Sequence, residues 1–159
     1  MRKIKFLILS LVAVALFSCE PTYVKEYNWA YPVSGDWTLI AYIDDTTAVS
    51  DPFEFKTYNS SFGKDSIWLD DYATTSSNGH FWSFKVKVGV DMKTNTFGTD
   101  TIVGSTNAIT GYKIKIKVKN GKIIGTDSLS MDVIFGDDAT TTYRIAGHRL
   151  TSYEEYMQQ

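Results

Sequence analysis

The sequence predicts an all-β protein, a single antiparallel up-and-down β-barrel of about eight strands. Apolar and polar side chains alternate with a period of two along most of the chain, and short polar turns separate the alternating segments. No stretch beyond the first twenty residues has a clear helical period, although residues 152–157 allow a short terminal turn. Such alternation is typical of a sheet with one face in water and one in the core. A closed barrel removes the edges that a flat sheet exposes, and a two-sheet sandwich is the alternative.

The expected strands follow an irregular lead-in, where Pro21 and Pro32 argue against regular structure. After this lead-in, the segments with a strand pattern are 37–43, 53–58, 67–70, 80–90, 99–103, 112–119, 122–125, 129–135 and 141–150. Asn120-Gly121 follows the sixth of these segments, which has the strongest pattern. This dipeptide favours a two-residue hairpin turn, so the sequence predicts a hairpin at this point.

Two of these segments, 80–90 and 112–119, alternate apolar residues with lysines. The side chains expected to face the interior are Trp82, Phe84, Val86, Tyr112, Ile114 and Ile116. The lysines expected to face water are Lys85, Lys87, Lys113, Lys115, Lys117 and Lys119. A slip of one residue would exchange the two faces, so the register should be firmly fixed. The lysines fit a solvated face that prevents strand pairing with other protein chains. Contact of these lysines with anionic lipid headgroups or acidic glycans is the functional alternative.

The first twenty residues have the order of a secretory signal. Arg2, Lys3 and Lys5 precede an almost wholly apolar run, residues 6–17. This run is too short for a helix that spans a membrane, which takes about 20 residues. Cys19, the only cysteine in the sequence, lies at the expected cleavage site.

Residues 16–19, Leu-Phe-Ser-Cys, resemble the lipobox of bacterial lipoproteins, whose cysteine is acylated and becomes the mature N-terminus. The resemblance implies a signal peptide at 1–18, a lipidated tether and lead-in at 19–33, and a barrel domain at 34–159. It also implies a bacterial cell-envelope protein held to a membrane through Cys19. The outer membrane is the first choice, and the side that the protein faces stays open. An ordinary signal peptide with an incidental cysteine is the alternative.

The composition after cleavage excludes several classes of function. Cleavage would leave thirteen basic and eighteen acidic residues, a net charge of −5, which disfavours a nucleic-acid partner. With Cys19 acylated, no thiol remains for a disulfide, a metal ligand or a nucleophile. The fold must then be stabilised by its core. The sequence has 4 Trp, 10 Tyr and 9 Phe, and all of these except Phe6 and Phe17 remain after cleavage and can contribute large apolar areas.

A Gly-x-Trp motif at residues 35–37, behind the irregular lead-in, resembles the signature of the lipocalins and the wider calycins. In that fold the tryptophan lies across the closed end of the barrel, under an arginine from the last strand. The resemblance therefore implies that Trp37 and Arg149 close this barrel. The lipobox, the Tyr-Pro-x-x-Gly-x-Trp start at 31–37 and the Gly-His-Arg at 147–149 together resemble small lipocalin-like envelope lipoproteins described as lipid-binding putative hydrolases.

The sequence shows no constellation of residues that would support catalysis. The Gly-x-Ser-x-Gly spacing of a nucleophile elbow does not occur, and the residues around Ser128 match an esterase motif only with an interruption. His80 and His148 are the only histidines and fit structural roles. The paired aspartates fit turns rather than Ca²⁺ ligands. We therefore predict no catalytic residue, no metal site and no cofactor, and hydrolase activity ranks last.

Two functions remain, because small eight-stranded barrels either hold one small ligand or fill their interior with side chains. The leading hypothesis is a lipid-anchored barrel that binds a small hydrophobic or amphipathic ligand. Its candidate lining residues are Phe53, Phe55, Trp82, Phe84, Tyr112 and Ile114. The alternative is a filled barrel that serves as an accessory or structural subunit of an envelope complex, of a glycan-handling kind for example. The sequence leaves protein partners open.

Overall fold

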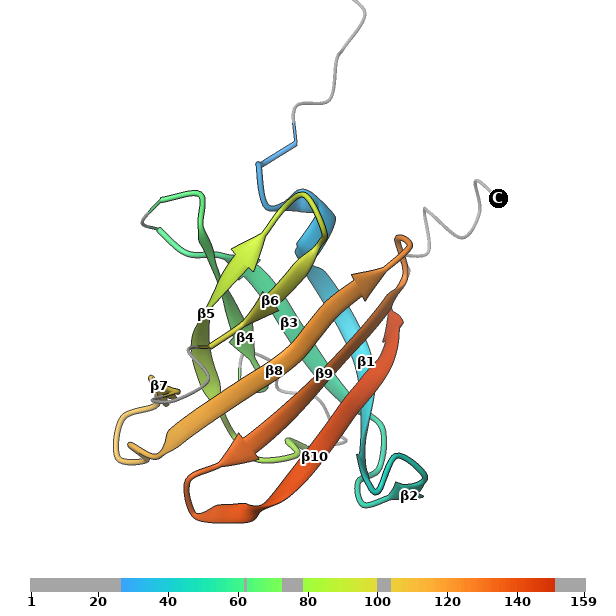
Figure 1. Ribbon diagram of the computed structural model, residues 1–159, viewed down its shortest axis with the longest axis vertical. Helices are drawn as coiled ribbons and strands as arrows, with labels where there is room; N and C mark the ends of the chain where they lie inside the picture. The colour runs from blue at the N-terminus through green and yellow to red at the C-terminus, as the bar shows by residue number, and fades with distance from the viewer. Residues whose placement is uncertain (1–26, 62, 73–78, 100–103, 151–159) are drawn as a thin grey trace, which may run out of the picture.

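The computed structural model describes residues 27–61, 63–72, 79–99 and 104–150, which form one antiparallel sheet of ten strands curled into a barrel (Figure 1). A 3₁₀ turn precedes the strands, and the elements in chain order are η1 (Tyr31–Val33), β1 (Gly35–Ile43), β2 (Thr47–Ala48), β3 (Phe53–Asn59), β4 (Ser66–Asp70), β5 (Lys85–Asp91), β6 (Thr96–Gly98), β7 (Ser105–Thr106), β8 (Lys115–Ile124), β9 (Ser128–Phe135) and β10 (Asp138–Arg149). The short β2 and β7 are appended to β1 and β8.

The first and last long strands close the barrel. β1 pairs with β10 in a register that runs from Trp37 opposite Arg149 to Tyr42 opposite Arg144. From β10 round to β1, the strands of the wall follow one another in the order β10, β9, β8, β6, β5, β4, β3 and β1. The predicted all-β, up-and-down barrel of eight strands is therefore confirmed, and the two-sheet sandwich is wrong because the edge strands pair with each other.

Alternating burial places one face of each strand in the core. In β9, for example, Leu129, Met131, Val133 and Phe135 are buried while the residues between them are half-exposed. The largest fully buried side chains are Trp37, Phe53, Phe55, Phe84, Phe135, Leu39, Ile67, Leu69, Ile116, Leu129, Met131 and Ile145. These side chains fill the interior of the barrel.

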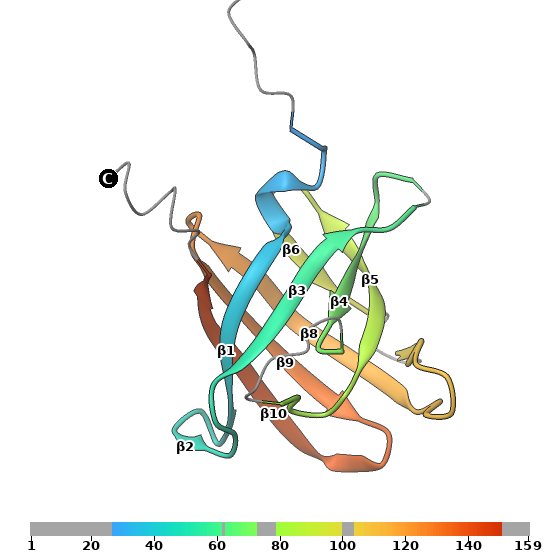
Figure 2. The same ribbon diagram turned by 180° about the vertical axis from the view of Figure 1, so that it is seen from behind.

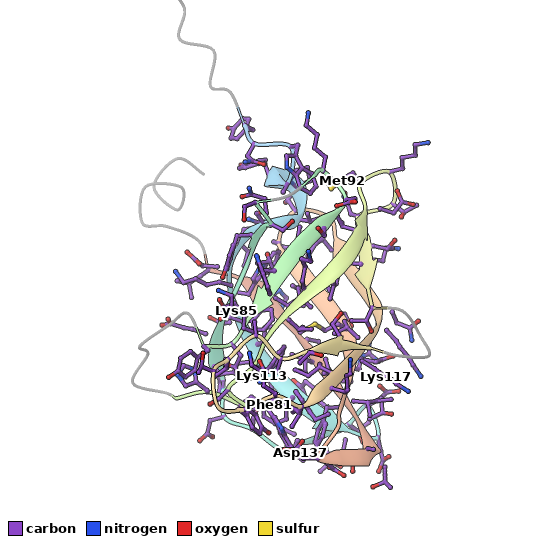
Figure 3. All side chains as sticks on the ribbon, turned by 90° about the vertical axis from the view of Figure 1, so that its left-hand side faces the viewer. Phe81, Lys85, Met92, Lys113, Lys117 and Asp137 are labelled. Atoms are coloured by element: carbon purple, nitrogen blue, oxygen red, sulfur yellow. The ribbon has the colours of Figure 1, made fainter. Side chains whose placement is uncertain are left out.

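The lysine row lies on the outer face, where Figure 3 shows Lys85, Lys113 and Lys117. Lys87, Lys113 and Lys115 are exposed, as the alternation predicts, whereas Lys117 and Lys119 are only half-exposed. Lys85 differs, because its side chain is only 34% exposed and its ammonium lies 3.2 Å from the Asp70 carboxylate.

The predicted hairpin at Asn120-Gly121 is wrong, because β8 runs through this dipeptide without turning. Residues on both sides of it pair with β9, and the register shifts between Lys119 and Lys122, which marks a β-bulge. Asn120 has a φ of 52°, so the left-handed conformation that favours Asn-Gly in a turn serves the bulge instead. A Cβ at Gly121 would overlap the Phe97 ring of β6, so the neighbouring strand requires a glycine here.

The predicted strand 80–90 is wrong in its first half, since β5 begins at Lys85. Residues 80–84 continue the apolar alternation, but Ser83 has a φ of 52°, which lies outside the range of a regular strand. Tyr112 and Ile114 also precede β8 rather than lying in it. β2, β6 and β7 were not predicted, and Thr99 lies just after β6.

Several predictions lie outside the described residues: the signal peptide, Cys19, residues 100–103 and the terminal turn at 152–157. Within the described residues, the structure contains no helix long and apolar enough to cross a membrane.

Candidate functional site

The two ends of the barrel are closed in different ways. Figure 2 shows η1 over the end where β1 begins, and the β9–β10 hairpin at the opposite end. We call these the η1 end and the hairpin end. In Figure 3, Phe81 and Asp137 lie toward the hairpin end, whereas Met92 lies at the other.

The η1 end is closed by fully buried side chains. Val33 of η1 and Trp37 of β1 have no exposed surface. The Trp37 indole N–H donates to the Thr57 hydroxyl oxygen at 2.9 Å, and this hydroxyl donates to the Val33 carbonyl at 2.7 Å. The indole is thus fixed to both the lead-in and β3, and its buried N–H is satisfied.

The structure brings Arg149 onto Trp37, as the family resemblance implies. The guanidinium carbon lies 4.4 Å from the centroid of the indole ring, within the range of a cation–π contact. Its Nη1 donates to the Ser34 carbonyl at 2.6 Å and its Nε to the Thr126 carbonyl at 2.8 Å. A Cβ at Gly35 would overlap Nη1, which explains why a glycine stands two residues before the tryptophan.

The hairpin end is covered by residues 79–83, which we call the cover segment. Its Phe81 and Trp82 are half-buried, and their rings pack onto the aromatic core. Trp82 stacks on Phe135 at 4.4 Å between centroids with an interplanar angle of 6°. Phe81 stacks on Phe53 at 5.6 Å. Both rings also contact Tyr143 of β10. The cover segment thus lies on the core without belonging to the strand ladder.

A single buried carboxylate, that of Asp71, holds the cover segment. Its Oδ2 accepts the backbone N–H groups of Trp82 and Ser83, both at 2.9 Å, and its Oδ1 accepts that of Phe81 at 3.4 Å. The side chain of Asp71 has no exposed surface. Burial raises its pKa above 3.8, although the three amides and nearby His80, whose Nδ1 is 3.8 Å away, act in the opposite direction.

Polar groups surround the apolar contacts at this end. The Trp82 indole N–H donates to the Tyr112 hydroxyl oxygen at 3.0 Å and to Asp137 at 3.3 Å, and the Tyr112 hydroxyl donates to Asp137. Burial and the Asp137 carboxylate raise the pKa of Tyr112. The Tyr143 hydroxyl donates to Asp138 at 2.7 Å, and burial together with this carboxylate raises the pKa of Tyr143 to about 12. An aromatic interior with a polar rim is the arrangement that an amphipathic molecule requires.

Residues 22–154 match the family described as "Lipid-binding putative hydrolase". The chain belongs to this family. The resemblance predicted from the sequence is thereby confirmed, and the barrel is that of a protein from a lipid-binding family. No curated protein matches the chain.

The lining residues predicted for this lipid-binding family member fall into two groups. Phe53, Phe55 and Phe84 are buried inside the barrel. The other three, Trp82, Tyr112 and Ile114, are half-buried. Of these, Trp82 and Tyr112 share the polar contacts of the hairpin end, and Ile114 packs against the core.

Sequence reasoning missed Phe81 and Asp71. Phe81 is out of phase with Trp82 in a strand, so a period of two assigns it to the outer face. Asp71 fits an ordinary turn as one of a pair of aspartates. An apolar pair that breaks the alternation, Phe81-Trp82, was the available signal.

The family description raises the question of a hydrolytic site, and Ser128 with His148 is the nearest arrangement. The Ser128 hydroxyl oxygen lies 3.4 Å from His148 Nδ1 across the β9–β10 pair. This hydroxyl donates to Asp127 at 3.0 Å, so the carboxylate bonds the serine and not the histidine. That order differs from a Ser–His–Asp triad. Among the described residues, no group of three or more His, Cys, Asp or Glu side chains is placed to hold a metal ion.

Proposed function

We propose that the protein binds one hydrophobic or amphipathic ligand with an acyl chain at the hairpin end. The acyl chain occupies the space that the Phe81 and Trp82 side chains otherwise fill. The observation that carries this proposal is that the aromatic cover of the barrel comes from outside the ladder, and that one carboxylate accepts its backbone N–H groups. Membership of a lipid-binding family supports the same class of ligand.

Displacement of the cover segment leaves the barrel wall intact. Residues 79–83 make no ladder pair, so their movement breaks the three bonds to Asp71 and the indole bonds of Trp82 but no strand pairing. Phe84, which is buried and accepts the Asp71 N–H through its carbonyl, stays in place. Exposing two aromatic side chains costs about 1.5–3 kcal/mol each, whereas each methylene of a buried acyl chain contributes about 0.8 kcal/mol. A chain of roughly ten buried methylenes therefore offsets the loss of the cover.

The rim of the hairpin end suits the headgroup of such a ligand. When Trp82 moves, the Tyr112 hydroxyl and the Asp137 carboxylate lose a donor and become available to a polar headgroup. These groups accept hydrogen bonds, so a headgroup with hydroxyl or ammonium donors fits them.

Native mass spectrometry of the protein purified from its own host tests the proposal. We expect a bound small molecule of lipid mass that is lost on denaturation. Trp82→Ala removes the ring that stacks on Phe135, and with it half of the cover, while the Phe81 ring still contacts Phe135. It should therefore retain or gain this ligand. A ligand-free protein, in both wild type and Trp82→Ala, would contradict the proposal. That result would favour the filled barrel, and with it an accessory subunit of an envelope complex.

The proposal includes a membrane anchor at Cys19, in a bacterial cell envelope and first of all in the outer membrane. The charged start, the short apolar run and the sole cysteine support it. Acylation at several positions of one cysteine holds a protein firmly, whereas a single chain holds it only marginally.

Cys19→Ser tests the anchor. The substituted protein should appear in the soluble fraction or keep its leader, as judged by fractionation and intact mass. Processed Cys19→Ser protein that still sediments with membranes after a high-salt wash would show that another feature is the tether.

A further inference from the structure

The outer wall of the barrel, away from the lipid site, carries a hollow beside two aromatic rings. Tyr58, Trp68 and Lys87 face one another across β3, β4 and β5, which lie side by side in Figure 2. The next row along the same strands consists of small residues, because Ser66 pairs with Gly89 and Gly89 with Gly98. The register therefore places a row of small side chains, which we call the low row, directly beside a row that contains two large aromatic side chains.

The low row forms an open hollow of about 480 Å³. Its lining residues are Gly63, Asp65, Ser66, Lys87 and Gly89. Gly89 is exposed and carries no side chain, so the floor at this point is backbone. Trp68 stands next to the hollow on the same outward face of β4 as Ser66, since side chains two residues apart share a face.

The polar groups around the hollow divide into satisfied and available ones. Lys85 is satisfied, because it pairs with Asp70 and lies over the rings of Tyr58 and Trp68 at 5.3 and 5.2 Å. The Lys87 side chain is exposed, and its ammonium has no ion pair or hydrogen bond within the described part of the chain. The same holds for the indole N–H of Trp68, unlike the internally bonded N–H groups of Trp37 and Trp82.

We propose that this hollow binds a pyranose unit of a neutral glycan. A pyranose presents an apolar C–H face, which suits the part of the Trp68 ring that stays exposed beside Lys85, and a rim of hydroxyls that both donate and accept. Asp65 offers carboxylate acceptors, while Lys87 and the Trp68 indole offer donors. Acid and base are balanced at the hollow, which favours a neutral sugar over a charged one. The hollow is open to solvent and, at about 480 Å³, has room for one or two sugar units of a glycan chain.

NMR titration of the purified protein with cellotriose, and with maltotriose in parallel, tests this proposal. The indole N–H resonance of Trp68, assigned with Trp68→Phe, should shift with at least one of the two sugars. The indole resonances of Trp37 and Trp82 should stay in place, because their N–H groups are bonded inside the protein.

Gly89→Leu supplies the decisive variant. A Cβ at Gly89 meets nothing closer than 3.7 Å, so a side chain there is tolerated and fills the hollow. We expect it to weaken sugar binding about tenfold or more. Lys87→Ala should also weaken binding, whereas Lys119→Ala, which removes a lysine from the outer face of β8, should not.

The proposal is overturned if neither sugar moves the Trp68 resonance, or if Gly89→Leu binds sugar like the wild type. Lipid retention by Gly89→Leu in native mass spectrometry should be unchanged, since the hollow is on the outer wall. The two proposals can therefore fail separately.

Discussion

A tryptophan lies at each end of this barrel, and the two differ in how their backbones are held. Trp37 is part of β1, paired with Phe55 on one side and Arg149 on the other, and is fully buried. Trp82 belongs to no strand, is half-buried and is fixed through the Asp71 carboxylate. Strand pairing and the Arg149 contact thus hold the tryptophan of the η1 end, whereas ring stacking and side-chain hydrogen bonds hold that of the hairpin end. Ladder membership, more than ring contacts, separates a structural residue from a displaceable one.

Truncating the two tryptophans should give the largest contrast. Trp37→Ala leaves a cavity under Arg149 and breaks the bond to Thr57, and should cost about 3–5 kcal/mol in the free energy of unfolding. Trp82→Ala removes a half-buried ring from a segment that can settle onto the gap, and should cost about 1–2 kcal/mol. Urea denaturation measures both. Equal losses would contradict the distinction between the ends.

Removing the carboxylate that holds the cover segment should loosen that segment selectively. Asp71→Ala takes the acceptor from three backbone N–H groups, and each unsatisfied buried donor costs about 1–3 kcal/mol unless water reaches it. We therefore expect faster hydrogen exchange at residues 81–83, with the amides of β1 and β10 unchanged. Asp132→Ala, at a half-exposed carboxylate of β9, is the matched control. Protection at 81–83 that survives Asp71→Ala would show that ring packing alone holds the segment.

The contact at the η1 end should be measurable as a coupling energy. A double-mutant cycle on Trp37→Phe and Arg149→Lys should show non-additivity of about 1–2 kcal/mol, because lysine keeps the charge but lacks the planar group that lies on the ring. Additive effects would mean that the carbonyl bonds of Arg149, and not the indole, hold the guanidinium in place.

Asp71 also predicts a small pH dependence of stability. Its folded pKa lies above 3.8, so the folded state binds the proton more tightly than the unfolded state does. The resulting stabilisation is present below 3.8 and is lost as the pH rises through the folded pKa. Opening of the cover segment exposes Asp71 to water, so higher pH should also favour opening. Asp71→Asn should flatten both dependences in pH-resolved denaturation, and an unaltered profile would assign them to other groups.

The sequence predicted the barrel because the wall obeys a local rule, the alternation of side chains along each strand. The sequence-based prediction failed where the conformation of a segment depends on contacts with residues far away in the sequence. Asn120-Gly121 has the composition of a turn, but the approach of Phe97 turns it into a bulge. Residues 80–84 keep the alternation of a strand. However, the buried Asp71 accepts the backbone N–H groups of Phe81, Trp82 and Ser83, and these residues lie outside the barrel wall. The pairing of Trp37 with Arg149 was accessible only through the family resemblance, since no local pattern joins residues so far apart in the chain.

Titration of the purified protein with monoolein, an acylglycerol whose headgroup carries hydroxyl donors, shows through the indole N–H resonances whether a lipid displaces the cover segment. We expect the Trp82 resonance to shift, because its bonds to Tyr112 and Asp137 break when the cover segment moves, and the Trp37 resonance to stay in place. A shift at Trp37 with Trp82 unmoved, or no shift at either, would contradict the proposed displacement of the cover segment.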